Sequence, residues 1–198
     1  MAEFDFFYDL GSPYSYLAAT QIEGIAARYG ATAHLYPITL GGIRKELGAQ
    51  MPSLPQLRYM GEDALRWAQH YGVPFGVPPS FPTRTIQALR CCVAAGSLGP
   101  AQHQTAMQAL FHAYWGLQQD IGDPAVLAAA LDGAGLAGAQ LVAQTEQPAV
   151  KEQLKKNTDL ALMRGVFGVP TLFIGERSFW GNDRLDFFER ALREETKR

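Results

Sequence analysis

The sequence predicts an α/β fold in which one α/β layer, read as β-α-β at its start and α-β-β-α at its end, is interrupted by an all-helical insertion. Apolar residues alternate at 4–8 and 32–38, as in strands, and a helical pattern separates the two runs. Only helical spacing follows from about 43 to 165. A short apolar run and a hairpin turn at 171–180 then precede a last amphipathic helix.

The first strand and helix meet at a serine. Phe4, Phe6 and Tyr8 alternate along a strand that we expect to have one well-buried face. Ser12 is a suitable N-cap for the helix that follows. Pro13 suits the first helical position, because its fixed φ is favourable and its missing N–H is not needed there. The strand therefore leads directly into a helix N-terminus.

The second strand and the insertion come next. Gly30 ends the first helix, Thr32–Ile38 is a strand parallel to the first, and Gly41-Gly42 ends that strand. The insertion carries helical spacing at Leu57–Tyr71, Thr85–Ala95, Gln102–Leu117, Ala125–Leu131, Ala139–Gln144 and Ala149–Met163. Proline- and glycine-containing breaks separate these helices.

The last elements are a hairpin and a helix. Thr171–Ile174 is a short strand, Gly175–Arg177 a turn and Ser178–Trp180 the returning strand. Asn182 or Asp183 is then expected to cap the final helix. This order is that of a thioredoxin-like layer, formed by 1–42 and 165–198, with 43–164 as a helical insertion domain and its connecting helix.

The composition is that of a globular chain without an evident nucleic-acid or membrane partner. The 198 residues are 47% hydrophobic, and 17 basic against 19 acidic residues give a net charge of −2. No apolar run approaches the roughly 20 residues of a membrane span, and the first residues lack the features of a leader. We therefore expect a cytoplasmic protein.

Ser12 and Ser15 have the spacing of a Cys-X-X-Cys redox pair with oxygen in place of both sulfurs. This arrangement cannot form a disulfide, but it keeps a hydroxyl donor beside the positive end of a helix. Such a site suits a thiolate carried by a ligand. The alternative is that Ser12 is a cap and nothing more.

Two later segments suit an extended, amino-acid-like ligand. Pro170 precedes a strand in a position where a cis proline would face the first helix, leaving the N–H and C=O of Val169 free to pair with a ligand strand. The helix start at Asn182 suits a carboxylate, and Asp183 suits an ammonium group. The alternatives are an ordinary trans turn proline and a plain helix cap.

Other candidate motifs do not support a site. The four histidines show no metal-ligand spacing, so we expect no metal. Cys91 and Cys92 lie in an apolar helical pattern and are expected to be small buried side chains. The Gly133–Gly138 segment matches G-x-G-x-x-G but follows a helix, so it is expected to be a connection between helices.

Several motifs in this order resemble 2-hydroxychromene-2-carboxylate isomerases, which group with kappa-class glutathione transferases in the DsbA-like branch of the thioredoxin superfamily. The motifs are Ser12–Tyr16, Phe81-Pro82, Ala88–Arg90, Phe111–Trp115, Gly165–Thr171 and Phe179–Arg184. The resemblance covers nearly the whole chain.

The resemblance implies a cofactor, a reaction and an assembly. Glutathione would bind with its thiol beside Ser12, its cysteinyl backbone on Val169 next to Pro170, and its γ-glutamyl head at Asn182 and Asp183. A Ser12-stabilised thiolate would add reversibly to a small aromatic carboxylate, and the adduct would allow cis-trans isomerisation. A homodimer is also implied.

The insertion departs from the family pattern in three places. Ala49 and Arg84 stand where asparagines are expected, and Gln56 and Arg58 compete for the place of an expected lysine. We expect Tyr16, Arg58 and Arg84 to face the substrate, with Arg84 adding a cation for an acidic substrate.

Two other functions fit the same sequence. One is kappa-like transfer of glutathione to an electrophile, which would consume thiol. The other is a non-catalytic DsbA-like binding module, which would not need Ser12. Thiol-disulfide exchange is not expected, because neither position 12 nor position 15 is a cysteine.

Overall fold

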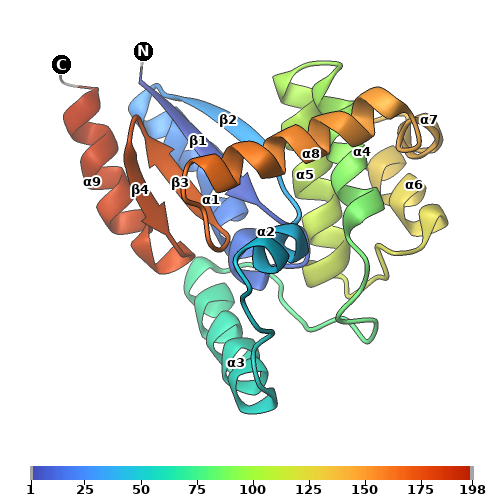
Figure 1. Ribbon diagram of the computed structural model, residues 1–198, viewed down its shortest axis with the longest axis horizontal. Coiled ribbons are helices and arrows are strands. Elements are labelled where there is room, and N and C mark those ends of the chain that lie inside the picture. The colour runs from blue at the N-terminus through green and yellow to red at the C-terminus, as the bar shows by residue number, and fades with distance from the viewer. Residues whose placement is uncertain (1, 197–198) are drawn as a thin grey trace.

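The computed structural model describes residues 2–196 as a four-stranded sheet with helices on both faces (Figure 1). Met1, Lys197 and Arg198, which complete the predicted thioredoxin-like domain, lie outside the described residues. The elements are β1 (Glu3–Tyr8), α1 (Pro13–Tyr29), β2 (Thr32–Pro37), α2 (Leu40–Glu46), α3 (Leu54–Tyr71), α4 (Ile86–Gly96), α5 (Pro100–Phe111), α6 (Pro124–Gly133), α7 (Gly138–Gln144), α8 (Pro148–Met163), β3 (Thr171–Ile174), β4 (Arg177–Trp180) and α9 (Leu185–Glu195).

The strand order is β2-β1-β3-β4. As predicted, β1 and β2 are parallel, while β3 runs antiparallel to both β1 and β4. Phe6 at the centre of β1 lies opposite Leu35 on one side and Leu172 on the other. The predicted α/β class with a thioredoxin-like layer is confirmed.

The first strand is buried on both faces, not on one as predicted. Phe4, Phe6 and Tyr8 belong to the core on the side of α1 and α9. Phe7 is equally inaccessible on the opposite face, where its ring stacks on Tyr36 with centroids 4.8 Å apart. The reason is that α2 and α8 cover this second face, as Figure 1 shows.

The helices α4 to α7 pack beside the sheet, while α3 projects away from it (Figure 1). The core on the α1 side continues without a break into α4, α5 and α6 through residues such as Leu89, Leu110 and Leu127. The predicted division into a thioredoxin-like domain and a separate insertion therefore remains a prediction. Among residues 2–196, no helix combines the length and apolarity that a membrane crossing requires.

One helix was missed. The sequence predicts that Gly41-Gly42 ends a strand, but β2 stops at Pro37 and both glycines lie inside α2. The Thr39 side chain does not cap this helix. The Asp9 carboxylate accepts the Leu40 N–H instead, at 2.8 Å. A remote carboxylate thus supplies the cap, and no pattern near residue 40 reveals it.

Candidate active site

Ser12 lies in the turn between β1 and α1 and caps α1, as predicted. It is 5% exposed, and its Oγ accepts the Ser15 N–H at 3.1 Å. The Ser12 hydroxyl donates to the Val169 carbonyl at 3.3 Å. The only proton of this hydroxyl is therefore directed at the segment before β3, across the N-terminus of the helix.

The Val169-Pro170 peptide bond is cis, which confirms the prediction made for it. The Pro170 carbonyl accepts the Gly181 N–H at 2.9 Å, and the segment packs so closely on β4 that a Cβ on Gly168 would lie 2.6 Å from Trp180 Nε1. The expectation that the Val169 carbonyl is free is wrong, because Ser12 occupies it. The Val169 N–H has no hydrogen-bond partner among residues 2–196.

The predicted cap of the last helix takes another form. Residues Asn182–Arg184 make a 3₁₀ turn, α9 begins at Leu185, and neither Asn182 nor Asp183 caps it with its side chain. The physical reason is that the turn directs Asn182 inward: it is 2% exposed, and its Nδ2 is buried without an acceptor. The Asn182 carbonyl accepts the Tyr71 hydroxyl of α3 at 3.4 Å.

Asp183 lies on the surface near the start of α1. Its carboxylate pairs with Arg184 at 3.0 Å. The Tyr14 hydroxyl, two residues beyond Ser12, donates to Asp63 of α3 at 2.9 Å. Burial raises the pKa of Tyr14 above its ordinary value, and the charges of Asp63 and Asp183 add to this shift. Ser12, Val169, Pro170, Asn182 and Asp183 thus come from three chain segments that meet beside α1.

Asp9 is a site residue that the sequence analysis missed. It is 6% exposed, and its carboxylate accepts the Gly11 N–H at 2.9 Å, the Leu40 N–H at 2.8 Å and the Thr85 hydroxyl at 3.0 Å. Burial raises the pKa of Asp9, while these three donors lower it. Its place at the end of the first strand, three residues before Ser12, was the available signal.

A loop of the insertion rests against the Ser12 turn. The Phe81-Pro82 bond is cis, and the loop continues through Arg84 to Thr85. A Cβ on Gly11 would lie 3.2 Å from Thr85 Cγ2, which is tighter than an ordinary contact, so the loop packs closely on the Ser12 turn at this glycine. Trp115 also fixes this turn, because its indole N–H donates to the Leu10 carbonyl at 2.9 Å.

The three predicted substrate residues occupy different environments. Tyr16 is 3% exposed, and its hydroxyl donates to the Pro74 carbonyl, so it belongs to the aromatic core. Arg84 is exposed on the loop beside Gly11, and Arg58 is exposed on α3. Among residues 2–196, no hydrogen bond or ion pair joins Arg58 or Arg84 to Ser12.

The cysteines of the chain are far from reactive. Cys91 and Cys92 are buried and unpaired, as predicted, and burial raises the pKa of each thiol to about 12. Among the described residues, no group of three or more His, Cys, Asp or Glu side chains could hold a metal ion. The donors on these three segments are the Ser12 hydroxyl, the Val169 N–H and the Asn182 amide. They suit a ligand with a thiolate, a carbonyl and a carboxylate.

Comparison with known proteins identifies the family of the chain. The family model for the DSBA-like thioredoxin domain matches residues 3–193. The 2-hydroxychromene-2-carboxylate isomerase of Sphingobium xenophagum is 34% identical over 192 residues, which cover 95% of this chain and 96% of the relative. Human glutathione S-transferase kappa 1 is 28% identical over 204 residues, covering 96% of this chain and 90% of that protein.

A solved structure leads to the same family. A selenomethionine 2-hydroxychromene-2-carboxylate isomerase superposes with a TM-score of 0.87 at 30% identity, covering 96% of this chain and 94% of the other. A similarity of this extent, in sequence and in fold, leaves no large segment of the chain unmatched. The chain therefore belongs to the 2-hydroxychromene-2-carboxylate isomerase family, within the proteins that share the DSBA-like thioredoxin domain.

Proposed function

We propose that the protein is a glutathione-dependent isomerase that interconverts the cis and trans forms of a small aromatic carboxylate of the 2-hydroxychromene-2-carboxylate type. The names of its isomerase and glutathione transferase relatives support this proposal. The observation that carries it is the buried Ser12 hydroxyl at a helix N-terminus in a chain whose own two thiols are inert. A thiol that reacts here has to come from a bound molecule.

Ser12 is the proposed catalytic residue. Glutathione, when bound, supplies a thiolate that adds reversibly to a conjugated carbon of the substrate. Ser12 would hold that thiolate with its hydroxyl at the positive end of α1. A helix N-terminus and a hydroxyl donor together favour an anion by roughly 1.5–3 kcal/mol, which is about one to two pKa units. Much of a thiol with an ordinary pKa near 8.5 would then be ionised at neutral pH.

The remaining groups would bind the two small molecules. Val169, next to Pro170, is proposed to pair with the cysteinyl backbone, and its unpartnered N–H supports this role. Asn182 and Asp183 are proposed to bind the γ-glutamyl carboxylate and ammonium, and the orphaned Asn182 amide supports the first of these contacts.

The substrate would be bound by residues outside the glutathione contacts. Arg84 is proposed to bind the substrate carboxylate, with support from its place beside the Ser12 turn. Arg58 and Tyr16 complete the proposed set, Tyr16 from its place in the aromatic core. The family resemblance further leads us to propose a cytoplasmic homodimer, which analytical ultracentrifugation of the purified protein would test.

The test compares wild type with Ser12→Ala by calorimetric titration of glutathione and by thiolate absorbance across pH. We expect the wild type to bind glutathione with a lowered thiol pKa, and Ser12→Ala to lose that lowering and most of the isomerase activity. Asp123→Ala is the matched control, because it removes an N-cap bond from α6 and should leave glutathione binding unchanged.

The outcomes separate the competing functions. Isomerisation of the chromene substrate without net loss of thiol supports the proposal, whereas steady thiol consumption with an electrophile identifies a transferase. Failure of the wild type to bind glutathione would contradict the proposal and favour a binding module.

A further inference from the structure

The Ser12 hydroxyl cannot serve its proposed thiolate while it keeps its present partner. It has one proton, which it donates to the Val169 carbonyl at 3.3 Å. Its oxygen already accepts the Ser15 N–H at 3.1 Å, so the side chain is fixed in place as the cap of α1. Donation to a sulfur therefore requires the proton to leave Val169.

If the Ser12 proton leaves Val169, the Val169 carbonyl loses its hydrogen-bond donor. Val169 is 7% exposed and Ser12 is 5% exposed, so water does not readily replace the lost donor. A buried carbonyl without a donor is unfavourable. The Val169 N–H, in contrast, has no partner within residues 2–196. The backbone edge thus presents one unsatisfied donor and one acceptor that depends on Ser12.

We infer that a bound peptide thiol and Ser12 exchange partners: the N–H of the ligand's cysteinyl residue takes over the Val169 carbonyl as the Ser12 proton turns to the thiolate. This inference rests on the proposed function. No covalent bond changes in the exchange, because the proton stays on Ser12 Oγ and only its acceptor differs. An extended ligand paired to the backbone edge supplies the required N–H.

The exchange defines the class of thiol that the site activates. A thiol with an acylated amino group on its Cα carries the N–H, so its thiolate receives the Ser12 proton while Val169 stays satisfied. A simple alkyl thiol, or an analogue with an ester oxygen in place of that N–H, leaves Val169 without a donor. The site should therefore lower the thiol pKa of either compound less than that of glutathione, even when the compound is fully bound.

The experiment titrates glutathione and S-methylglutathione into the wild type and Ser12→Ala. Glutathione should bind Ser12→Ala more weakly, by roughly tenfold if one pKa unit of thiolate stabilisation is lost. S-methylglutathione keeps the peptide N–H but offers no thiolate. It should bind Ser12→Ala several-fold more tightly than wild type, because its N–H then meets a carbonyl that no side chain satisfies. Asp123→Ala again controls for loss of a helix cap.

A second measurement follows the bound thiol by absorbance. The ester analogue, at saturation, should show less than half of the pKa lowering that glutathione shows in the wild type. The inference is overturned if S-methylglutathione binds Ser12→Ala no more tightly than it binds the wild type. It is also overturned if the wild type lowers the thiol pKa of the ester analogue as much as it lowers that of glutathione. Failure of wild type to bind glutathione at all contradicts the proposed function instead, and this inference with it.

Discussion

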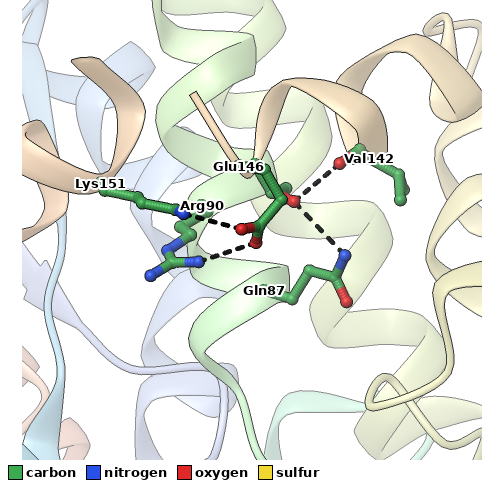
Figure 2. Close-up of polar contacts among 6 residues, drawn as sticks. Gln87, Arg90, Val142, Glu146 and Lys151 are labelled. Carbon is green, nitrogen blue, oxygen red and sulfur yellow. Dashed lines mark hydrogen bonds and ion pairs between the residues drawn. The ribbon is translucent and has the colours of Figure 1, made fainter. Parts of the chain in front are cut away.

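Two carboxylates each join separate parts of this chain, but in opposite surroundings. Asp9 lies at the site and links β1, α2 and the segment before α4 through three neutral donors. Glu146 lies between α7 and α8 and links that connection to α4 (Figure 2). It pairs with Arg90 at 3.1 Å and with Lys151 at 2.7 Å. Asp9 is 6% exposed, whereas the Glu146 side chain is 68% exposed.

This difference decides what each carboxylate does. Water can replace the partners of Glu146, and salt screens its charges, so its ion pairs position helices without contributing much stability. Water cannot readily take the place of the buried Asp9 carboxylate, and two of its donors are partly buried backbone N–H groups that would be left unpaired. The comparison indicates that burial, rather than the number of partners, determines how much a polar cluster stabilises the segments that it joins.

The largest effect is expected at Asp9. Asp9→Ala leaves the N–H groups of Gly11 and Leu40 and the Thr85 hydroxyl without their acceptor, so we expect a loss of about 2–4 kcal/mol in the free energy of unfolding. Asp9→Asn keeps the shape but offers only one acceptor oxygen, and should lose about half as much. Urea unfolding followed by circular dichroism measures both. Equal stability of Asp9→Ala and wild type would show that burial does not make the contacts of Asp9 more stabilising than those of Glu146.

A partly buried histidine away from both carboxylates extends the comparison to the pH dependence of stability. His103 Nε2 lies 3.0 Å from the Tyr8 hydroxyl, and burial lowers the pKa of His103 to about 4. Between this pKa and the ordinary value near 6.5, the unfolded chain binds more protons than the folded one. His103 therefore contributes full stability above pH 6.5, and that contribution is lost as pH falls toward 4.

The matching variant is His103→Gln. We expect it to reduce the acid dependence of unfolding by up to about 1.4 kcal/mol per pH unit between pH 6.5 and 4. Unfolding free energies measured at several pH values would show it. An unchanged slope would mean that His103 takes up its proton as readily in the folded chain as in the unfolded one.

Thr85→Val isolates one bond of the Asp9 network. Valine has nearly the shape of threonine but cannot donate to Asp9, while the other two donors remain. We expect a loss of about 1 kcal/mol, well below that of Asp9→Ala. Thermal unfolding measures it, with Thr105→Val as control, since that hydroxyl bonds a carbonyl on an exposed helix surface. An effect as large as that of Asp9→Ala would assign the whole network to this single contact.

The smallest effect is expected at Glu146. Glu146→Gln removes the charge that Arg90 and Lys151 face, and we expect no measurable change in melting temperature. Raising the salt concentration should affect wild type and variant alike. A clear destabilisation that salt abolishes would show that this exposed cluster holds the insertion more strongly than its surroundings suggest.

Much of the fold could be predicted because its elements depend on local patterns. The alternation at Phe4, Phe6 and Tyr8, the Ser12-Pro13 helix start and the hairpin after Thr171 all appear where the sequence indicates. The Cys91-Cys92 pair and the Gly133–Gly138 connection also have the predicted structures. In each case neighbours within a few residues supply the determining interactions.

The sequence by itself therefore determined the succession of strands and of the helices other than α2, the family and the position of Ser12 at a helix N-terminus. Only the tertiary structure decided that Asp9 caps α2, that Ser12 donates to Val169 and that Asn182 turns inward without capping α9. These contacts join residues 31 and 157 positions apart in the first two cases, and the third depends on how the 3₁₀ turn packs. A polar group finds such a partner only after the core has brought distant segments together, so local patterns cannot contain it.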